Sequence, residues 1–377
     1  MWGKIYYSVF AALLVATDEP HPSHDGEDAC HLLAPPNADF AFSITFLFHP
    51  DAEGKNNNIF FSPVGISMAL SMLAVGAKGS TLSQIYSSLG YSGLQASQEA
   101  MQLEAGAGVA IREGFEVVDQ FLKDVQHYYN SEAFSVDFSK PEIAAEEINK
   151  FIAKKTHDKI TNMVKDLDDD TVMMLINYMY VRGKWDKQFD AKLTHNADFK
   201  VDNDTTVQVD MMKRTGTYAF YQDPVNQTTV MMVPYKGNAS MMIVLPDEGK
   251  MKEVEESICR HQLKICSVDL FMPKFSITAT SKLNDILQDM GMTDAFSNTA
   301  DFSGMTGEVK VKVSRVDHQA VLSVDEKGTE AVSVTTIETM PISLPDTVML
   351  NQPFLVLIVE DTTKSILFMG KITNPTE

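Results

Sequence analysis

The order of hydrophobic and polar positions divides the chain into a mostly helical first half and a second half made mostly of strands. In the first half, apolar residues recur every three or four positions, which is the period of an amphipathic helix. The clearest predicted helix covers 63–76, because Ser62 stands at its N-cap, a proline follows in its first turn and Gly76 ends it. In the second half, two nearly continuous apolar runs flank Gly237-Asn238, which predicts a hairpin. Helices followed by antiparallel strands predict an α+β fold.

The same pattern predicts four further helices and a second hairpin. Asn37 would cap the first of these helices, and Thr81 opens another with a capping-box pattern. The other two helices are expected near 115–129 and 142–154, and the hairpin turns at 361–364.

The N-terminus predicts export. Residues 5–16 form a short apolar run behind Lys4, and polar, acidic residues follow. This order is typical of a secretory signal peptide, and the run is too short to span a membrane stably; a buried N-terminal strand is the alternative. We expect 1–16 to be a signal peptide, 17–36 a flexible tail and 37–377 one domain, with the protein secreted into extracellular fluid.

Composition narrows the range of partners. The chain has 377 residues, 44% of them hydrophobic and 22% charged, which is ordinary for a globular protein. Its net charge of −20 argues against nucleic acid or an anionic membrane as a partner, because like charges repel. The acidic surface by itself indicates solubility and no particular activity.

Cysteines and sugar acceptors fit a secreted protein held together by its core. Three cysteines, Cys30, Cys259 and Cys266, are too few for a disulfide framework, so either the last two pair or all three are free. Glycosylation is predicted at three Asn-x-Ser/Thr acceptors: Asn203, Asn226 and Asn238.

Two motifs resemble catalytic or metal sites, but each fails on its details. Gly106 and Gly108 lack the third glycine of a dinucleotide-binding loop. The acidic run 166–171 has Thr171 where a calcium loop needs glycine, and Asn177 where it needs glutamate. No metalloprotease, nucleophile-elbow or phosphate-loop pattern is present, so we expect no enzyme, no metal and no cofactor.

One segment near the C-terminus has the composition of a strand where a loop is expected. Its first face, read at every second position, consists of Thr329, Ala331, Ser333, Thr335, Ile337 and Thr339. The second face consists of Glu330, Val332, Val334, Thr336 and Glu338. If the segment entered a sheet, the first face could be buried without desolvating a charge, while the glutamates stayed in water.

The residues around this segment argue against an ordinary half-buried strand, which is the alternative. Gly328 precedes it as a hinge, and Pro341 and Pro345 follow it. We find no turn that folds the segment back onto a hairpin partner.

Longer stretches from Asn37 to the C-terminus resemble the serpin family. The matching segments are "NNIFFSPVGISMALSMLAVGAKGST", "SEAFSVDF", "INYMYVRGKWDKQFD", "VDMMKR", "PYKGNASMMIVLPDEGK", "AVLSVDEKGTEAVS" and "NQPFLVLIVEDTTKSILFMGKITNP". The resemblance implies a single α+β domain with three β-sheets, about eight or nine helices and an exposed reactive-centre loop from Gly328 onward. It also implies a suicide substrate: a serine protease cuts the loop, the N-terminal part of the loop inserts into the main sheet, and the protease stays trapped as an acyl-enzyme. The native state would then be a kinetic trap.

The family's spacing also implies the position of the cut. The residue before the cut lies 16 positions after Glu326, which gives the reactive bond Ile342–Ser343. A cut two residues earlier or later would place Pro341 or Pro345 directly after the bond, where proline is poorly tolerated. An uncharged, β-branched residue before the cut suits the shallow apolar pocket of an elastase-like protease. The hinge of the loop comprises Gly328, Thr329, Glu330, Ala331, Val332, Ser333 and Val334.

Six positions resemble residues that control the opening of the main sheet in this family: Ser62, Asn177, Trp185, His318, Lys274 and Glu326. Ser62, Asn177 and His318 would form a polar cluster under the sheet. The cluster is expected to be weaker here, because Gly65 stands where the family usually has a second serine. Lys274 and Glu326 would form a salt bridge at the top of the sheet, worth up to about 1 kcal/mol as a simple pair. Plain core packing or surface pairing is the alternative for all six.

One departure from the family bears on partners. Between "SSLGYSGLQASQ" and "LEAGAGVAI" the chain lacks about sixteen residues that form a heparin-binding helix in some members. With that gap and the acidic charge, heparin is not expected to bind. We expect a monomer whose partner is an elastase-like serine protease. A non-inhibitory serpin, such as a hormone carrier or storage protein, is the rival interpretation, because a carrier could keep the same hinge.

Overall fold

A computed structural model of the chain describes residues 25–48, 57–91, 106–180, 183–224, 227–251, 264–307, 309–328 and 345–377. Several predictions from the sequence therefore lie outside the described residues. These are the signal peptide 1–16, the loop segment 329–334, the reactive bond Ile342–Ser343, the acceptor Asn226 and the cysteine Cys259.

Seven α-helices occur in the described part of the chain. They are α2 (Asp25–Leu47), α3 (Pro63–Gly76), α4 (Gly79–Ser88), α5 (Asp119–Tyr129), α6 (Pro141–Lys155), α8 (Asn284–Asp289) and α9 (Ser303–Thr306). Two short 3₁₀ turns cover Ala191–Leu193 and Asp294–Phe296. Helix α3 begins and ends where the sequence predicts, with the Ser62 hydroxyl accepting from the Gly65 backbone N–H at its N-cap.

Two helices begin elsewhere than predicted. The first was expected to start at Asn37, but α2 starts at Asp25, so residues 25–36 of the expected tail are helical. The stretch 27–34 consists mainly of good helix formers, and the helix continues through two prolines. The Asn37 side chain does not cap a helix but donates to the Ile366 carbonyl at 3.0 Å. Thr81 likewise lies inside α4, where its hydroxyl accepts from the Asp301 N–H at 3.0 Å.

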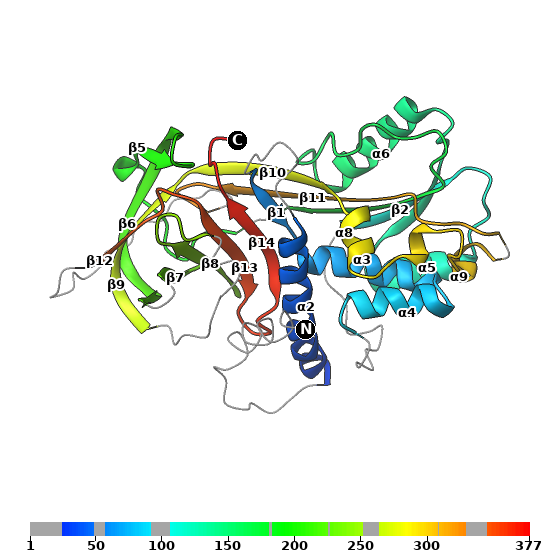
Figure 1. The fold of residues 1–377 in the computed structure, drawn as a ribbon, viewed down its shortest axis with the longest axis horizontal. Coiled ribbons are helices and arrows are strands. Elements are labelled where there is room, and N and C mark those ends of the chain that lie inside the picture. The colour runs from blue at the N-terminus through cyan, green and yellow to red at the C-terminus, as the bar shows by residue number, and fades with distance from the viewer. Residues whose placement is uncertain are drawn as a thin grey trace.

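A five-stranded sheet runs across the middle of the molecule, in the order β10-β11-β4-β2-β3. Its strands are β2 (Gly106–Arg112), β3 (Glu132–Val136), β4 (Met173–Tyr180), β10 (Phe275–Lys282) and β11 (Arg315–Val324). Figure 1 shows α6 on one face of this sheet and α3 and α8 on the other. Two separate hydrophobic clusters follow from this arrangement, because one face of β4 packs under α6 and the other against α3.

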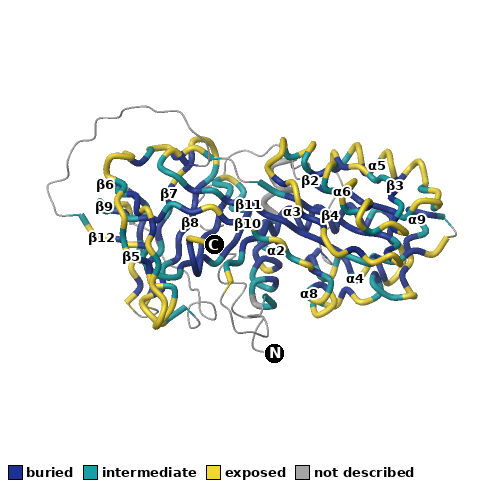
Figure 2. The backbone as a smooth tube through the Cα atoms, turned by 90° about the horizontal axis from the view of Figure 1, so that it is seen from above, coloured by how far each residue is buried: buried dark blue, intermediate teal, exposed yellow. Residues whose placement is uncertain are grey.

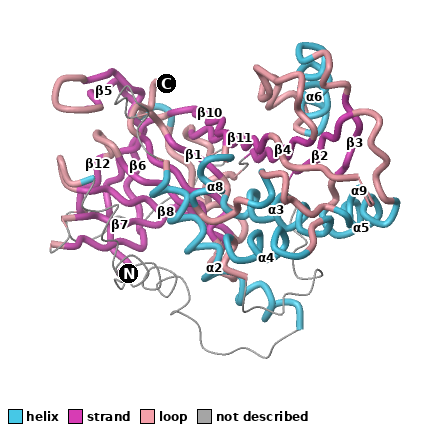
Figure 3. The backbone as a smooth tube through the Cα atoms, turned by 45° about the vertical axis from the view of Figure 1, so that its right-hand side comes forward, coloured by secondary structure: helices cyan, strands magenta, loops and turns pink. Residues whose placement is uncertain are grey.

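The remaining strands form a nine-stranded sheet in the order β1-β14-β13-β8-β7-β6-β9-β12, with β5 paired to β6. They are β1 (Ile59–Phe61), β5 (His195–Lys200), β6 (Thr206–Asp223), β7 (Thr228–Pro234), β8 (Ala239–Pro246), β9 (Lys264–Pro273), β12 (Asp346–Met349), β13 (Phe354–Glu360) and β14 (Ile366–Ile372). Strand β6 has 18 residues and pairs with β9 along most of its length and with β7 at its end. The resemblance implies three sheets, but because β6 pairs with both β7 and β9 the described strands form two. Figure 3 shows the nine-stranded sheet in one half of the molecule, while β4, β2 and β3 extend into the other half among the helices.

The central strands of both sheets are buried in the interior. Figure 2 shows β11 and β4 as a buried band through the molecule, with exposed positions on the outer turns of α4 and α5 and on the strands at the rim. The predicted hairpins are confirmed: β7 and β8 join at 235–238, and β13 and β14 join at 361–365. The α+β architecture predicted from the sequence is thus the architecture of the protein.

Candidate functional site

The candidate site is centred on the line where β4 and β11 meet, which we call the seam. The two strands run parallel, and Asn177 on β4 lies directly opposite His318 on β11. All other pairs in this sheet are antiparallel except β2 with β3 at its edge. A parallel pair in the centre of a sheet is the place where one further strand, antiparallel to both neighbours, fits.

Beneath the seam, Ser62, Asn177 and His318 form a connected polar cluster, as the sequence predicts. The Ser62 backbone N–H donates to His318 Nε2 at 3.0 Å, and His318 Nδ1 lies 2.6 Å from Asn177 Oδ1. Because a backbone N–H can only donate, Nε2 must be the acceptor, so the proton of the neutral ring sits on Nδ1 and is donated to Asn177. The Ser62 hydroxyl extends the cluster by donating to the Leu367 carbonyl on β14 at 2.7 Å. The cluster thereby ties both seam strands to α3 and to the second sheet.

His318 is held in the neutral form. Its side chain is completely buried, and this burial lowers the pKa of His318 to about 3. Desolvation penalises the charged imidazolium, and both ring nitrogens already have partners that suit the neutral ring. The hydrogen bonds of the seam therefore do not change over the physiological pH range.

Gly65 contributes to the cluster through its backbone. Its N–H donates to the Ser62 hydroxyl at 3.0 Å. A Cβ at this position would lie 2.9 Å from Asn177 Oδ1, 2.9 Å from Met179 Cγ and 3.1 Å from Ser62 Oγ. The site is therefore packed around a glycine, and the absent serine leaves no hole to fill.

The upper end of the seam is closed by a tight turn at Asp325–Gly328. Asp325 and Gly328 exchange backbone hydrogen bonds of 3.1 and 3.2 Å, and Gly328 also bridges to Lys184. This turn, which lies directly before the segment 329–339, was not predicted from the sequence. The sequence signal was weak because the two central residues, Glu326 and Lys327, are not typical hairpin residues.

Gly328 is required in this turn. Its φ is +113°, which is unfavourable for residues with a side chain. A Cβ there would lie 2.3 Å from the Gly183 carbonyl oxygen and 2.6 Å from the Trp185 nitrogen, both of them backbone atoms that cannot move aside. The predicted hinge glycine therefore holds the turn against the chain that leaves β4.

Trp185, one of the six positions that the family resemblance singles out, lies directly beneath this turn. The side chain is fully buried, and its indole N–H donates to the Asp325 carbonyl at 3.0 Å. Its backbone N–H donates to the Lys327 carbonyl at 3.2 Å. The indole stacks on Tyr235, with ring centroids 4.5 Å apart and ring planes 7° apart. Tyr235 was not predicted, because no sequence pattern links a tyrosine in a hairpin to a tryptophan 50 positions earlier.

Lys274 and Glu326 form the predicted salt bridge at the same end of the seam. Lys274 Nζ lies 3.2 Å from Glu326 Oε2, and the Thr194 hydroxyl donates to Glu326 Oε1 at 2.8 Å. Partial burial acts to raise the pKa of Glu326, but the hydrogen bonds from its own backbone, Thr194 and Lys274 outweigh it and hold the pKa below its usual value. Thr194 was missed because it lies far from both partners in the sequence.

The predicted sugar acceptors lie at turns. Asn203 is exposed in the turn between β5 and β6. Asn238 is exposed in the β7–β8 turn, where its side-chain amide donates to Glu360 and Thr362. Cys266 lies on β9, partly buried.

The two rejected motifs have structural roles. Gly106 and Gly108 are part of β2, and a Cβ on Gly108 would lie 3.3 Å from the Phe151 ring of α6. In the acidic run 166–171, backbone carbonyls accept hydrogen bonds from Arg112 and Arg315. Within the described residues, no group of three His, Cys, Asp or Glu side chains is placed to hold a metal ion. No helix in the same part of the chain is long and apolar enough to cross a membrane.

A central seam with a polar cluster beneath it and a buried tryptophan at its mouth defines the class of protein. The family model "Serpin (serine protease inhibitor)" matches residues 35–375, and the chain belongs to the serpin family. The family is one of protease inhibitors, so the chain is not an enzyme.

Individual relatives agree with this assignment. An "Alpha-1-antitrypsin homolog" of the carp Cyprinus carpio is 80% identical over 80% of this chain and 87% of that protein. "Alpha-1-antiproteinase" of Bos taurus is 40% identical over 96% of this chain and 92% of that protein. Among solved structures, human thyroxine-binding globulin complexed with its hormone superposes with a TM-score of 0.86 at 37% identity, covering 93% of this chain and all of that one. The family and the carp and bovine relatives support a serine protease inhibitor.

Proposed function

We propose that this chain is a secreted inhibitor that acts as a suicide substrate, with Ile342–Ser343 as the bond offered to an elastase-like serine protease. The observation that carries the proposal is the parallel seam of β4 and β11 together with the turn that ends at Gly328. A strand that continues from this turn runs antiparallel to both seam strands. Once they separate, it can pair with both.

The driving force is the completion of the sheet. Residues 329–339 would enter with hydrogen bonds on both edges, and each bond contributes about 0.5–1.5 kcal/mol net. Insertion would therefore release on the order of 10 kcal/mol, to which buried Ile337 and threonine methyl groups add. A protease that is still esterified to Ile342 would be carried along with the inserting strand. Until the bond is cut, the closed seam keeps the protein in a kinetic trap.

The target class follows from the residue before the cut. Ile342 has no charge for a trypsin-like pocket, and its branched side chain suits a shallow apolar one. The first test is to mix the purified protein with an elastase, separate the products on a denaturing gel and sequence the small released fragment. A band at the summed mass and a fragment that begins at Ser343 are expected. Cleavage at this bond without such a band would contradict inhibition.

A second test addresses insertion itself. Thr329→Arg forces a charge into the sheet at the start of the inserting strand, so the variant should be cut as a substrate and form little covalent complex. Thr347→Arg is the matched control, since it places the same side chain at an exposed position of β12 on the other flank of the loop. It should inhibit like the wild type. Full inhibition by Thr329→Arg would refute the insertion mechanism.

A hormone carrier is the second candidate, supported by the likeness to thyroxine-binding globulin. A carrier would be cut without trapping the protease, so the gel separates the two candidates. Calorimetric titration with thyroxine then tests the carrier directly.

We further propose that the protein is a secreted, monomeric glycoprotein. Exposed Asn203 and Asn238 are the structural candidates for N-linked sugars, with Asn226 the third acceptor. Enzymatic removal of N-linked sugars should lower the mass of the secreted protein, and a retained 1–16 segment in that protein would contradict the signal peptide. The net charge of −20 supports the expectation that heparin does not accelerate inhibition.

A further inference from the structure

The face of the five-stranded sheet under α6 holds a buried carboxylate that the Ser62–Asn177–His318 cluster does not use. Asp317 on β11 is fully buried, and its Oδ1 accepts from Arg315 Nε at 2.7 Å. Its Oδ2 has no hydrogen-bond partner among the described residues. A buried oxygen without a partner is costly, so its retention calls for an explanation.

Among the described residues, Arg315 has guanidinium N–H groups at the same place that make no hydrogen bond. Its Nη1 donates to the carbonyls of Lys165 at 2.7 Å and Asp166 at 3.1 Å, and its Nε is taken by Asp317. A guanidinium carries five N–H groups, and in the described part of the chain Nη2 has no partner. The Arg315 side chain as a whole is 13% exposed.

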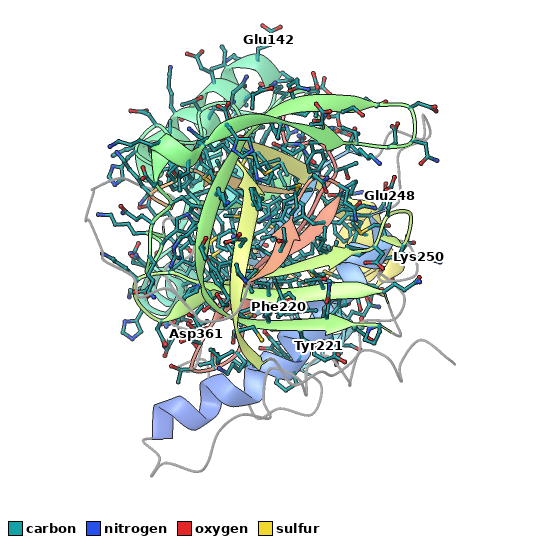
Figure 4. All side chains as sticks on the ribbon, turned by 90° about the vertical axis from the view of Figure 1, so that its left-hand side faces the viewer. Glu142, Phe220, Tyr221, Glu248, Lys250 and Asp361 are labelled. Atoms are coloured by element: carbon teal, nitrogen blue, oxygen red, sulfur yellow. The ribbon has the colours of Figure 1, made fainter. Side chains whose placement is uncertain are left out.

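This face of the sheet is covered and is not open to solvent. Asp317 lies opposite Ile176 across the seam, and Ile176 packs in one cluster with Ile148 and Ile152 of α6. Figure 4 shows Glu142, on the first turn of the same helix, projecting outward on its far side. A side chain that entered the seam on this face would therefore meet protein.

The register of an entering strand is set by the turn. Lys184 and Asp325 both pair with Gly328, and they are separated by the same 141 positions that separate Asn177 from His318. Both bridges therefore specify one register: each step forward from Gly328 is one step back along β4 and along β11. Thr335, seven residues beyond Gly328, would then come opposite Asn177 and His318.

The same register places two residues of the second face beside the unused polar groups. Thr336, eight residues beyond Gly328, would come opposite Asp317. Glu338, ten residues beyond it, would come opposite Arg315 on β11 and Met174 on β4, and Met174 is fully buried. In this register Glu338 would be covered, whereas the alternation alone predicts that both glutamates stay in water.

We propose that Arg315 and Asp317 form a receptor for the inserted loop, with Arg315 pairing with the carboxylate of Glu338 and Asp317 accepting from the hydroxyl of Thr336. The proposal rests on the proposed function and names residues that select this loop in this register. Directly opposed residues of neighbouring strands have Cβ atoms about 4.5–5.5 Å apart, which is within reach of such pairs. Without the cation, Glu338 would enter a covered face unpaired, which is strongly unfavourable.

The test is a double-mutant cycle with two readouts. Arg315→Met, Glu338→Met and the double variant are compared with the wild type for the number of inhibitor molecules consumed per protease trapped. They are also compared for the rise in melting temperature when the loop is cut. Arg315→Met alone should raise consumption about two- to fivefold and reduce the thermal gain, because Glu338 is left without its partner. Adding Glu338→Met should restore both, since an apolar pair replaces the charged one.

Arg112→Met is the matched control. Arg112 also donates to backbone carbonyls of the acidic run, those of Thr171 and Asp169, but it lies on β2, away from the seam. Its effects should not be restored by Glu338→Met. If Arg315 acts only in the native fold, Glu338→Met should not restore the Arg315→Met variant either. That result would overturn the receptor.

The two readouts separate this proposal from the proposed function. If cutting the wild-type loop gives no thermal gain, insertion fails and the receptor fails with it. If the gain occurs but Arg315 and Glu338 are uncoupled, only the receptor is overturned. If coupling is seen in the melting temperatures while the gel shows no trapped protease, the receptor stands and the inhibitory function fails.

Discussion

The protonation of His318 gives the sharpest test of the closed seam. Its pKa falls from an ordinary value of 6.5 to about 3 in the fold, because burial disfavours the charged ring. Below pH 6.5 the unfolded chain binds a proton here that the folded chain refuses. Above about pH 6.5 the free energy of unfolding is therefore not reduced by His318. Below this pH it falls steadily through His318 as the pH drops toward 3.

The size of the effect follows from the same numbers. One pKa unit corresponds to about 1.4 kcal/mol, so lowering the pH from 7.5 to 5 should remove about 2 kcal/mol of unfolding free energy through His318. The assay is denaturant unfolding of the wild type and of His318→Gln at both pH values. The glutamine variant does not titrate, so its loss should be smaller by about 2 kcal/mol, while every other titrating group cancels in the comparison. Equal losses in the two proteins would refute a neutral, buried His318.

Three further substitutions test the surroundings of the seam. Gly328→Ala should displace the turn and weaken inhibition, because the added Cβ would collide with the Gly183 carbonyl oxygen. The measurement is the number of inhibitor molecules consumed per protease trapped, which should rise. Unchanged inhibition would contradict a fixed turn. Gly65→Ala should lower the unfolding free energy by about 1–3 kcal/mol through overpacking, and a denaturant titration that showed stabilisation would mean that the site has room. Lys274→Met should lower the free energy of unfolding by at most about 1 kcal/mol at pH 7. This difference from the wild type should vanish as acid protonates Glu326 through its lowered pKa. A difference that persisted in acid would show that the salt bridge is not its cause.

Local structure could be predicted wherever the signal lies within a few residues. Ser62 and Gly76 mark both ends of α3, and Gly237-Asn238 marks the β7–β8 turn, because caps and turns depend on neighbouring backbone groups. Prediction failed where a tertiary contact decides the outcome. Asn37 bonds to β14 and leaves the start of α2 to the residues before it.

In the candidate site, too, contacts between distant residues could not be predicted from local sequence patterns. His318 and Asn177 meet across 141 positions, and no periodicity in the sequence pairs them; the family resemblance alone brought them together. The register across the seam could not be predicted either, because it depends on how the turn at Gly328 bridges to Lys184. The covered face over Met174 is likewise a property of α6 packing and is invisible in the alternation of the loop.

The order of strands has a consequence for how the protein is made. Strand β14 lies between β1 and β13, and β13 lies between β14 and β8, so the last 24 residues complete a sheet that the first strand begins. The Ser62 hydroxyl finds its acceptor, Leu367, only in that final strand. A growing chain therefore exposes the loop segment before the parts that hold the seam shut exist. The active form can be fixed only after the C-terminus has been synthesised, and a chain that stops before β13 would lack the means to reach it.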